Sequence, residues 1–166
     1  MGKIKYIVIA GAVLVAGIIA FIIFSQSEEA KVKKQFNFLA EKMNKTPNET
    51  PLISVARANR IKDLFAETCT VYAPAYSFSR DISSQDLSSL VLTTRSRYSE
   101  MSLEFYDFVI EFPEEGSAQV NVTASMTGKL TTGEYVDDIH ELKCKLKKTE
   151  DIWLLREIEV VEVLKK

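Results

Sequence analysis

The feature that most constrains this chain is an uncharged run near its start. Residues 6–24, YIVIAGAVLVAGIIAFIIF, contain no charged residue and no Asn, Gln, Ser, Thr or Pro. As an α-helix this run would be about 28 Å long, which matches the hydrocarbon thickness of a bilayer. A buried helix of a soluble core is normally shorter and carries polar positions, so the run predicts a membrane-spanning helix at 6–24.

The flanks of the run favour an uncleaved signal anchor, with a cleaved signal peptide as the alternative. A basic start precedes it, but the run exceeds a usual signal-peptide core, and Ser25 and Ser27 form a poor cleavage site. We therefore expect a cytoplasmic tail at 1–5 and a single pass through the inner (plasma) membrane. The domain at 25–166 is then expected on the periplasmic or extracellular side.

The chain after the run has the composition of an ordinary soluble domain. Without residues 1–24 the net charge is −4, with both signs interspersed. Nothing in this distribution resembles a nucleic-acid-binding surface, so no nucleic acid partner is expected. The lysines of the segment 143–148 alternate with apolar residues, which predicts the solvent-exposed face of a strand.

The pattern of apolar residues predicts helices first and strands later. Helical spacing and capping residues predict a first helix that begins at Ser25 and a second that Thr50 caps. A third is predicted to start at Ser83 or Ser84. Between the second and third helices, residues 69–73 predict a short strand.

After residue 97 the apolar period changes to two. Residues 101–112 predict a long strand, and 118–126 alternate strictly between apolar and polar side chains. Turns then lead to strands at 135–148 and 152–164. The prediction is a meander of four long antiparallel strands, whose apolar face the three helices cover.

This order of elements resembles the nuclear transport factor 2-like superfamily, also called SnoaL-like or cystatin-like cones. The residues that carry the resemblance are IKDLFAETCTVYAP (61–74) and VNVTASMTGKLTTGEYVDDIHELKCKLKKTEDIWLLREIEV (120–160). It covers about residues 28–164 and is one of pattern, not of a diagnostic motif. It implies an α+β cone, with three helices packed on a curved antiparallel sheet and a pocket at the open end. The superfamily includes isomerase-like and dehydratase-like enzymes as well as non-enzymatic binding or dimerisation modules.

Isomerase- or dehydratase-type chemistry in such a cone would need a base in an apolar pocket, facing a hydrogen-bond donor. The candidate bases are His140, the sole histidine, and Asp107. The candidate pocket residues are Tyr72, Tyr76, Tyr106 and His140. None aligns securely with the catalytic positions of the superfamily, so no catalytic residue is assigned. With one histidine and no acidic cluster, we expect neither a metal site nor a cofactor.

The chain has two cysteines, Cys69 and Cys144. In an exported domain a disulfide between them is one interpretation, and a pair of small, buried, unpaired thiols is the other. The sequence leaves both open.

Two classes of function follow from these observations. The first is a single-pass, membrane-anchored binding or assembly module of the cell envelope, non-catalytic, which uses the cone pocket or the sheet face. Its partner would be a second copy in a homodimer, another envelope protein or a small apolar ligand. One N-terminal span followed by this fold resembles the inner-membrane scaffold component of type IV secretion machines. The alternative is a small isomerase- or lyase-type enzyme that uses the cone pocket.

Overall fold

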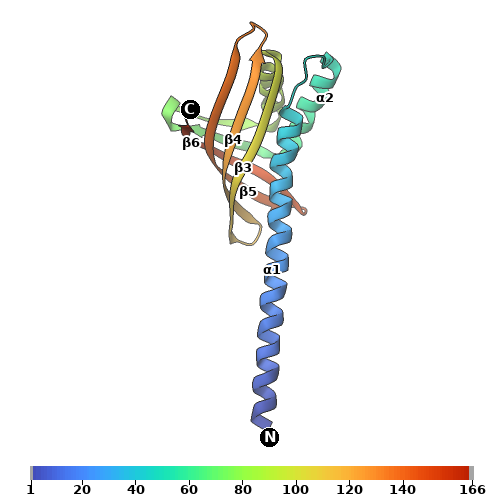
Figure 1. Ribbon diagram of the computed structural model, residues 1–166, viewed down its shortest axis with the longest axis vertical. Coiled ribbons are helices and arrows are strands. Elements are labelled where there is room, and N and C mark those ends of the chain that lie inside the picture. Colours follow the sequence, from blue (N-terminus) through green and yellow to red (C-terminus); the bar gives the residue numbers. More distant parts are fainter. Residues whose placement is uncertain (1, 165–166) are drawn as a thin grey trace.

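The structure is a computed structural model that describes the backbone of residues 2–164 and the side chains of residues 13–23, 27–75 and 77–161. The described chain forms three α-helices and one six-stranded sheet, which curves beside the upper part of the longest helix (Figure 1). The helices are α1 (Gly2–Met43), α2 (Pro51–Ile61) and α3 (Ser84–Ser96). The strands are β1 (Phe65–Ala73), β2 (Phe78–Ser83), β3 (Tyr98–Glu114), β4 (Ser117–Leu130), β5 (Tyr135–Thr149) and β6 (Ile152–Leu164). Short 3₁₀ turns, η1 (Lys62–Leu64) and η2 (Pro74–Tyr76), flank β1.

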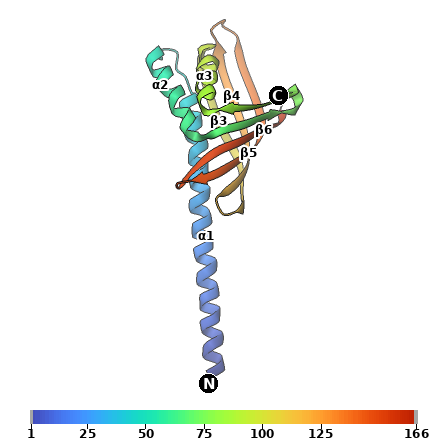
Figure 2. The ribbon, with the colours of Figure 1, turned by 180° about the vertical axis from the view of Figure 1, so that it is seen from behind.

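The apolar run and the first helix of the domain form one continuous helix. α1 has 42 residues, which corresponds to a length of about 63 Å. The prediction that a helix begins at Ser25 is therefore wrong, because Ser25 lies inside α1. Residues 28–43 are mostly good helix formers, and packing of the buried Val32 and Phe36 against the sheet holds this half of α1 in place. The other half projects from the domain (Figure 2).

Within the described residues, one helix is long and apolar enough to cross a membrane, by length and composition alone. The large apolar side chains from Val13 to Ile23 are 47–71% exposed. Most of this surface is open to the surroundings, and Phe21 alone among these side chains lines a pocket against the domain.

The caps predicted for the two shorter helices are confirmed. The Thr50 hydroxyl accepts a hydrogen bond from the Ile53 amide at 3.4 Å at the start of α2. Ser83 accepts from the Asp86 amide at 3.1 Å at the start of α3. Both bonds satisfy amide groups that the first turn of a helix leaves without intrahelical partners.

The sheet order is β2-β1-β6-β5-β4-β3. The predicted meander is confirmed, because β3, β4, β5 and β6 pair antiparallel in sequence. β6 then returns beside β1 and pairs with it in parallel, which the sequence pattern did not predict. Register shifts interrupt the β3–β4 and β5–β6 pairs, and one of them contains Asp107, whose φ is 55°. Such bulges bend and twist strands, which explains how the sheet curves into a cone.

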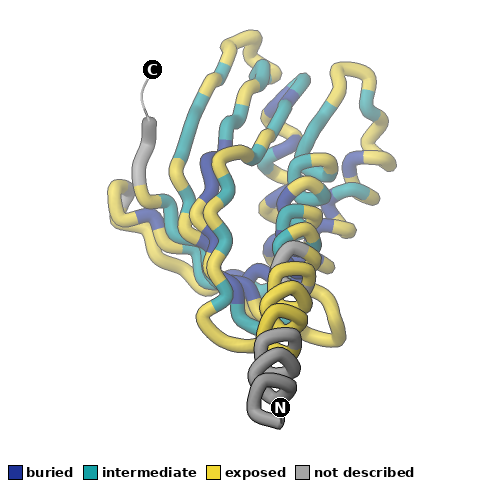
Figure 3. The backbone as a smooth tube through the Cα atoms, turned by 60° about the horizontal axis from the view of Figure 1, so that its bottom comes forward, coloured by how far each residue is buried: buried dark blue, intermediate teal, exposed yellow. Residues whose placement is uncertain are grey.

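The concave face of the sheet carries the core, and the buried residues gather inside the curve (Figure 3). The predicted alternation on β4 is confirmed, since Ala118, Val120 and Val122 are buried. Phe36 of α1 meets the rings of Phe105 and Phe108 of β3 edge to face, with centroids 5.3 and 5.5 Å apart. Aromatic side chains therefore fill the space between α1 and β3.

A buried arginine fixes the C-terminal end of α1. The Nη1 atom of Arg95 donates to the carbonyl oxygens of Lys42, Met43 and Asn44 at 2.6, 2.6 and 2.9 Å. Its Nη2 atom pairs with the carboxylate of Glu49. Burial raises the pKa of Glu49, but bonds from the Ser54 hydroxyl and Arg95 outweigh this effect and lower it overall. The last carbonyl groups of α1, which have no partner within the helix, are thus capped by a charged group inside the domain.

Candidate functional site

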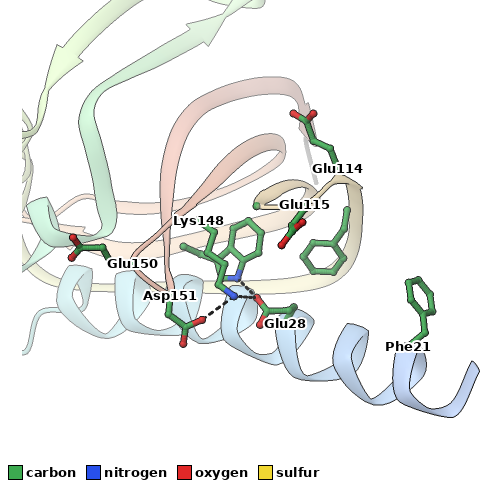
Figure 4. A pocket seen from close by; sticks show the side chains of 10 residues that line it. Phe21, Glu28, Glu114, Glu115, Lys148, Glu150 and Asp151 are labelled. Atoms are coloured by element: carbon green, nitrogen blue, oxygen red, sulfur yellow. Dashed lines mark hydrogen bonds and ion pairs between the residues drawn. The ribbon is translucent and has the colours of Figure 1, made fainter. Parts of the chain in front are cut away.

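A pocket of about 530 Å³ lies where the apolar half of α1 leaves the domain. It is enclosed by α1, the β3–β4 hairpin and the β5–β6 hairpin (Figure 4). We call it the helix–hairpin pocket. Its lining residues are Phe21, Glu28, Phe112, Glu114, Glu115, Gly116, Lys148, Glu150, Asp151 and Trp153.

Two tight turns place acidic residues around this pocket. Gly116 ends the β3–β4 turn with a φ of 74°, a left-handed conformation that costs glycine little. In the β5–β6 turn, Glu150 and Asp151 have φ values of 49° and 67°. A two-residue hairpin turn with positive φ at both positions matches the right-handed twist of its strands. Such turns most often have the sequence Asn-Gly, because few other residues adopt positive φ readily. A side chain in this conformation costs about 1–2 kcal/mol per residue. The turn therefore presents two carboxylates at a local energetic cost.

A buried carboxylate joins α1 to the β5–β6 hairpin. The side chain of Glu28 is 6% exposed and accepts a hydrogen bond from the Trp153 indole N–H at 2.9 Å. Lys148 and Lys31 approach its two oxygens, each at 3.0 Å. The same lysines pair with Asp151 at 2.8 and 3.1 Å. Two carboxylates and two ammonium groups thus form one balanced network across the helix and the turn. Figure 4 shows the part of it that Lys148, Glu28 and Asp151 form.

The network keeps Glu28 ionised despite its burial. Burial raises the pKa of Glu28, but the hydrogen bonds from Lys148, Lys31 and Trp153 outweigh this effect, and the pKa falls below its ordinary value of 4.5. Hydrogen bonds to Asp151 and Glu28 raise the pKa of Lys148. At neutral pH both ends of the network are therefore charged and paired.

Three further carboxylates at the pocket are not neutralised in this way. Glu114, Glu115 and Glu150 are exposed, and among the described residues their side chains make no ion pair or hydrogen bond. Because the Glu28 network is balanced, these three groups give the pocket a formal charge of about −3. The opposite wall is apolar: Phe112 and Trp153 lie with ring centroids 5.7 Å apart, and Phe21 extends the wall along α1. The pocket thus combines an aromatic wall with acidic residues on its two turns, of which Glu115 lies near the aromatic rings whereas Glu114 and Glu150 point outward (Figure 4).

The candidate residues at the cone's open end are not brought together. Tyr72 on β1 and Tyr106 on β3 are 42% and 39% exposed, and β6, β5 and β4 separate their strands. The side chain of Tyr76 lies outside the described side chains. His140 is half-buried on β5, and its Nδ1 atom is buried without a hydrogen-bond partner.

The two candidate bases are also apart. Asp107 is exposed in its bulge on β3, and β4 lies between it and His140. Among the described residues, no carboxylate is hydrogen-bonded to His140, and no group of three or more His, Cys, Asp or Glu side chains is arranged to hold a metal ion. The acid–base pair that a lyase of this type would need is therefore not assembled from these two residues.

Both cysteines are buried free thiols. Cys69 on β1 and Cys144 on β5 lie on either side of β6, and two strand spacings put their backbones about 10 Å apart. A disulfide needs Cα atoms within about 7 Å, so these two strands would have to move to form one. Burial raises the pKa of Cys69 to about 11 and that of Cys144 to about 12. The structure therefore agrees with the interpretation as unpaired thiols.

The helix–hairpin pocket was not among the sequence-based candidates. Its residues come from three separate segments, 21–28, 112–116 and 148–153, and its two turns were predicted only as turns. The signal available in the sequence was the acidic composition of both turns, together with a lone tryptophan beside the second.

No known family profile and no curated protein sequence matches this chain. Solved structures match it over most of its length. A protein provisionally described as a scytalone dehydratase from Novosphingobium aromaticivorans has a TM-score of 0.66 and 16% identity, covering 85% of this chain and 87% of its own. The Kfla4162 protein from Kribbella flavida has a TM-score of 0.68 and 11% identity, covering 82% and 91%. The type 3 hexachlorocyclohexane dehydrochlorinase LinA from Novosphingobium barchaimii has a TM-score of 0.60 and 9% identity, covering 84% and 90%.

At these identities the similarity establishes the fold and nothing finer. The chain carries a nuclear transport factor 2-like α+β cone, as its sequence pattern predicted. Proteins with this fold are diverse in function, so a function must be argued from the site.

Proposed function

We propose that this protein is a single-pass, membrane-anchored, non-catalytic binding module of the cell envelope, and that the helix–hairpin pocket is its binding site. The observation that carries the proposal is that Phe21, inside the apolar run, and Trp153, inside the domain, line the same pocket. With residues 6–24 in a bilayer, this pocket opens at the membrane surface. Its size is that of a small-molecule site, and aromatic walls with a few charged groups are typical of such sites.

The exposed half of α1 supports the anchoring. Its described large apolar side chains, from Val13 to Ile23, are largely exposed, and a hydrocarbon environment would stabilise them by about 1.5–3 kcal/mol each. Trp153, Lys31 and Lys148 lie just beyond the run, where aromatic and basic residues favour the interface of a membrane. The proposed location is the inner (plasma) membrane, with the cone on the periplasmic or extracellular side. A homodimer or another envelope protein would then engage the faces of the cone that the pocket leaves free.

The proposal is tested by topology in bacterial cells. The full-length protein should remain in the membrane fraction after an alkaline carbonate wash and keep residues 1–24, as read by mass spectrometry of the intact chain. External protease should digest the cone in spheroplasts but not in inverted membrane vesicles. A soluble chain that lacks its first residues, or a cone protected in spheroplasts, would refute the anchored arrangement.

A second candidate is an isomerase- or lyase-type enzyme that uses the cone interior. Two structural neighbours are described as a dehydratase and a dehydrochlorinase, and the Nδ1 atom of His140 is buried without a hydrogen-bond partner among the described residues. The direct test is turnover of hexachlorocyclohexane and of hydroxylated ring compounds by the full-length protein. Turnover that His140→Phe abolishes would establish the enzyme and displace the non-catalytic proposal.

A further inference from the structure

We infer that the helix–hairpin pocket binds the ammonium headgroup of a membrane lipid from the leaflet that the cone faces. This inference rests on the proposed anchoring, because it requires residue 21 to lie within that leaflet. The ligand class is a lipid with a positively charged amine, of which phosphatidylethanolamine is the simplest representative.

The charge of the pocket selects the headgroup. The lysines near the pocket, Lys31 and Lys148, are already paired with Glu28 and Asp151. They are not free to neutralise a phosphate or a carboxylate from a ligand. Glu114, Glu115 and Glu150 remain unpaired among the described residues, so an anionic headgroup is repelled and an ammonium group is attracted.

The aromatic wall provides a second contact for a cation. Phe112 is half-buried and offers its ring to the pocket, whereas the Trp153 ring is 2% exposed and already has the Lys148 ammonium 6.0 Å from its centre. Phe112 beside it continues the same apolar surface. An ammonium group between this surface and the acidic turns would meet favourable electrostatics on both sides.

The position of Phe21 identifies a lipid as the source of the amine. Phe21 precedes Glu28 by seven residues, which corresponds to about 10 Å along the helix, and it lines the pocket from the side of the apolar run. A volume of about 530 Å³ accommodates a headgroup. The acyl chains would stay in the bilayer along α1, so the ligand enters the pocket by lateral diffusion without crossing water.

The test uses the full-length protein in nanodiscs of phosphatidylglycerol, to which phosphatidylethanolamine with the same acyl chains is added. Trp153 is the only tryptophan and lines the pocket, so its emission reports occupancy. Native mass spectrometry counts the lipids retained. We expect a saturable change in emission and at least about a tenfold preference for the amine lipid over phosphatidylglycerol, which corresponds to about 1.4 kcal/mol.

Charge-matched variants distinguish an effect of the pocket carboxylates from an effect of the net charge of the protein. The test variant combines Glu114→Gln, Glu115→Gln and Glu150→Gln, and it should bind both lipids within about twofold of each other. The control combines Glu104→Gln, Glu111→Gln and Glu141→Gln, three exposed acids of β3 and β5 away from the pocket. It should keep the full preference at the same net charge.

Each outcome has a defined meaning. Equal binding of the two lipids by the wild type, or loss of the preference in both variants, would overturn the inference while leaving the anchoring intact. If octylammonium chloride saturates the emission change but the two lipids do not differ, the amine chemistry holds and the lipid source is wrong. Failure of the protein to enter nanodiscs at all would instead refute the proposed anchoring.

Discussion

Replacement of Glu28 by Gln tests whether the buried network fixes α1 to the β5–β6 hairpin. Glutamine has nearly the same shape and keeps one oxygen for the indole of Trp153, but it removes the charge. A buried hydrogen bond to a charged group contributes about 1.5–3 kcal/mol, of which a neutral acceptor retains part. The contacts to Lys148 and Lys31, whose side chains are 23% and 39% exposed, add about 0.5 kcal/mol each. We therefore expect Glu28→Gln to lower the free energy of unfolding by about 2 kcal/mol.

The assay is thermal unfolding of the full-length protein in detergent, followed by the emission of its single tryptophan, Trp153. For a domain of this size, 2 kcal/mol corresponds to a fall in Tm of about 4–8 °C. The matched control is Glu29→Gln, which makes the same change one position along α1. Glu29 pairs with Lys33 at 2.7 Å, but both side chains are about 40% exposed. Its removal should cost less than about 0.5 kcal/mol.

The pH dependence of the same difference provides an independent check. Because the pKa of Glu28 is lower in the folded state than its ordinary value of 4.5, its contribution to stability is complete above that value. It is lost as the pH falls through the folded-state pKa, when the carboxylate takes up a proton. The Tm values of the wild type and Glu28→Gln should therefore converge below pH 4.5. Equal effects of Glu28→Gln and Glu29→Gln, or a Tm difference that stays constant from pH 7 to pH 3, would refute the reasoning.

Three further predictions follow from the core. Arg95→Met should lower the free energy of unfolding by about 3 kcal/mol, because it removes the buried partner of Glu49 and leaves that carboxylate only the partly exposed Arg57 at 3.4 Å and the Ser54 hydroxyl; a denaturant titration showing a loss below 1 kcal/mol would contradict this. A thiol reagent at pH 8 should leave Cys69 and Cys144 unmodified in the folded protein and label both after denaturation, because burial raises their pKa values to about 11 and 12; rapid labelling of the native protein would count against it. Gly128→Ala should destabilise the cone by about 1–3 kcal/mol, since its Cβ would lie 2.8 Å from a backbone oxygen of β3; an unchanged Tm would show that β3 yields freely.

Local chemistry made part of the fold predictable. Thr50 and Ser83 cap their helices because a side-chain oxygen three residues before an amide satisfies it in any context. One face of β4 is buried and the other is not, and this difference appears in the sequence as alternating apolar and polar residues. The cone itself was anticipated from the order of these elements.

Tertiary context explains what could not be predicted. Ser25 has the spacing of a cap, but helix formers on both sides make an uninterrupted helix more favourable. β2 has no apolar period that would predict a strand, because four of its six residues are exposed and Ile82 alone is buried. The helix–hairpin pocket could not be predicted, since Phe21, Glu28 and Trp153 line one pocket only because the start of β6 lies against α1, where Trp153 donates to Glu28.

The continuity of α1 has a mechanical consequence. With no break between Gly2 and Met43, the tilt of the apolar run in a bilayer and the orientation of the cone are the same angle. From residue 24 to residue 43 the helix extends about 29 Å, so a change in tilt of 10° would displace its far end by about 5 Å. A thinner bilayer tilts such a span further. In the proposed anchoring, the continuous α1 therefore makes the angle between the cone and the lipid surface depend on the local thickness of the membrane.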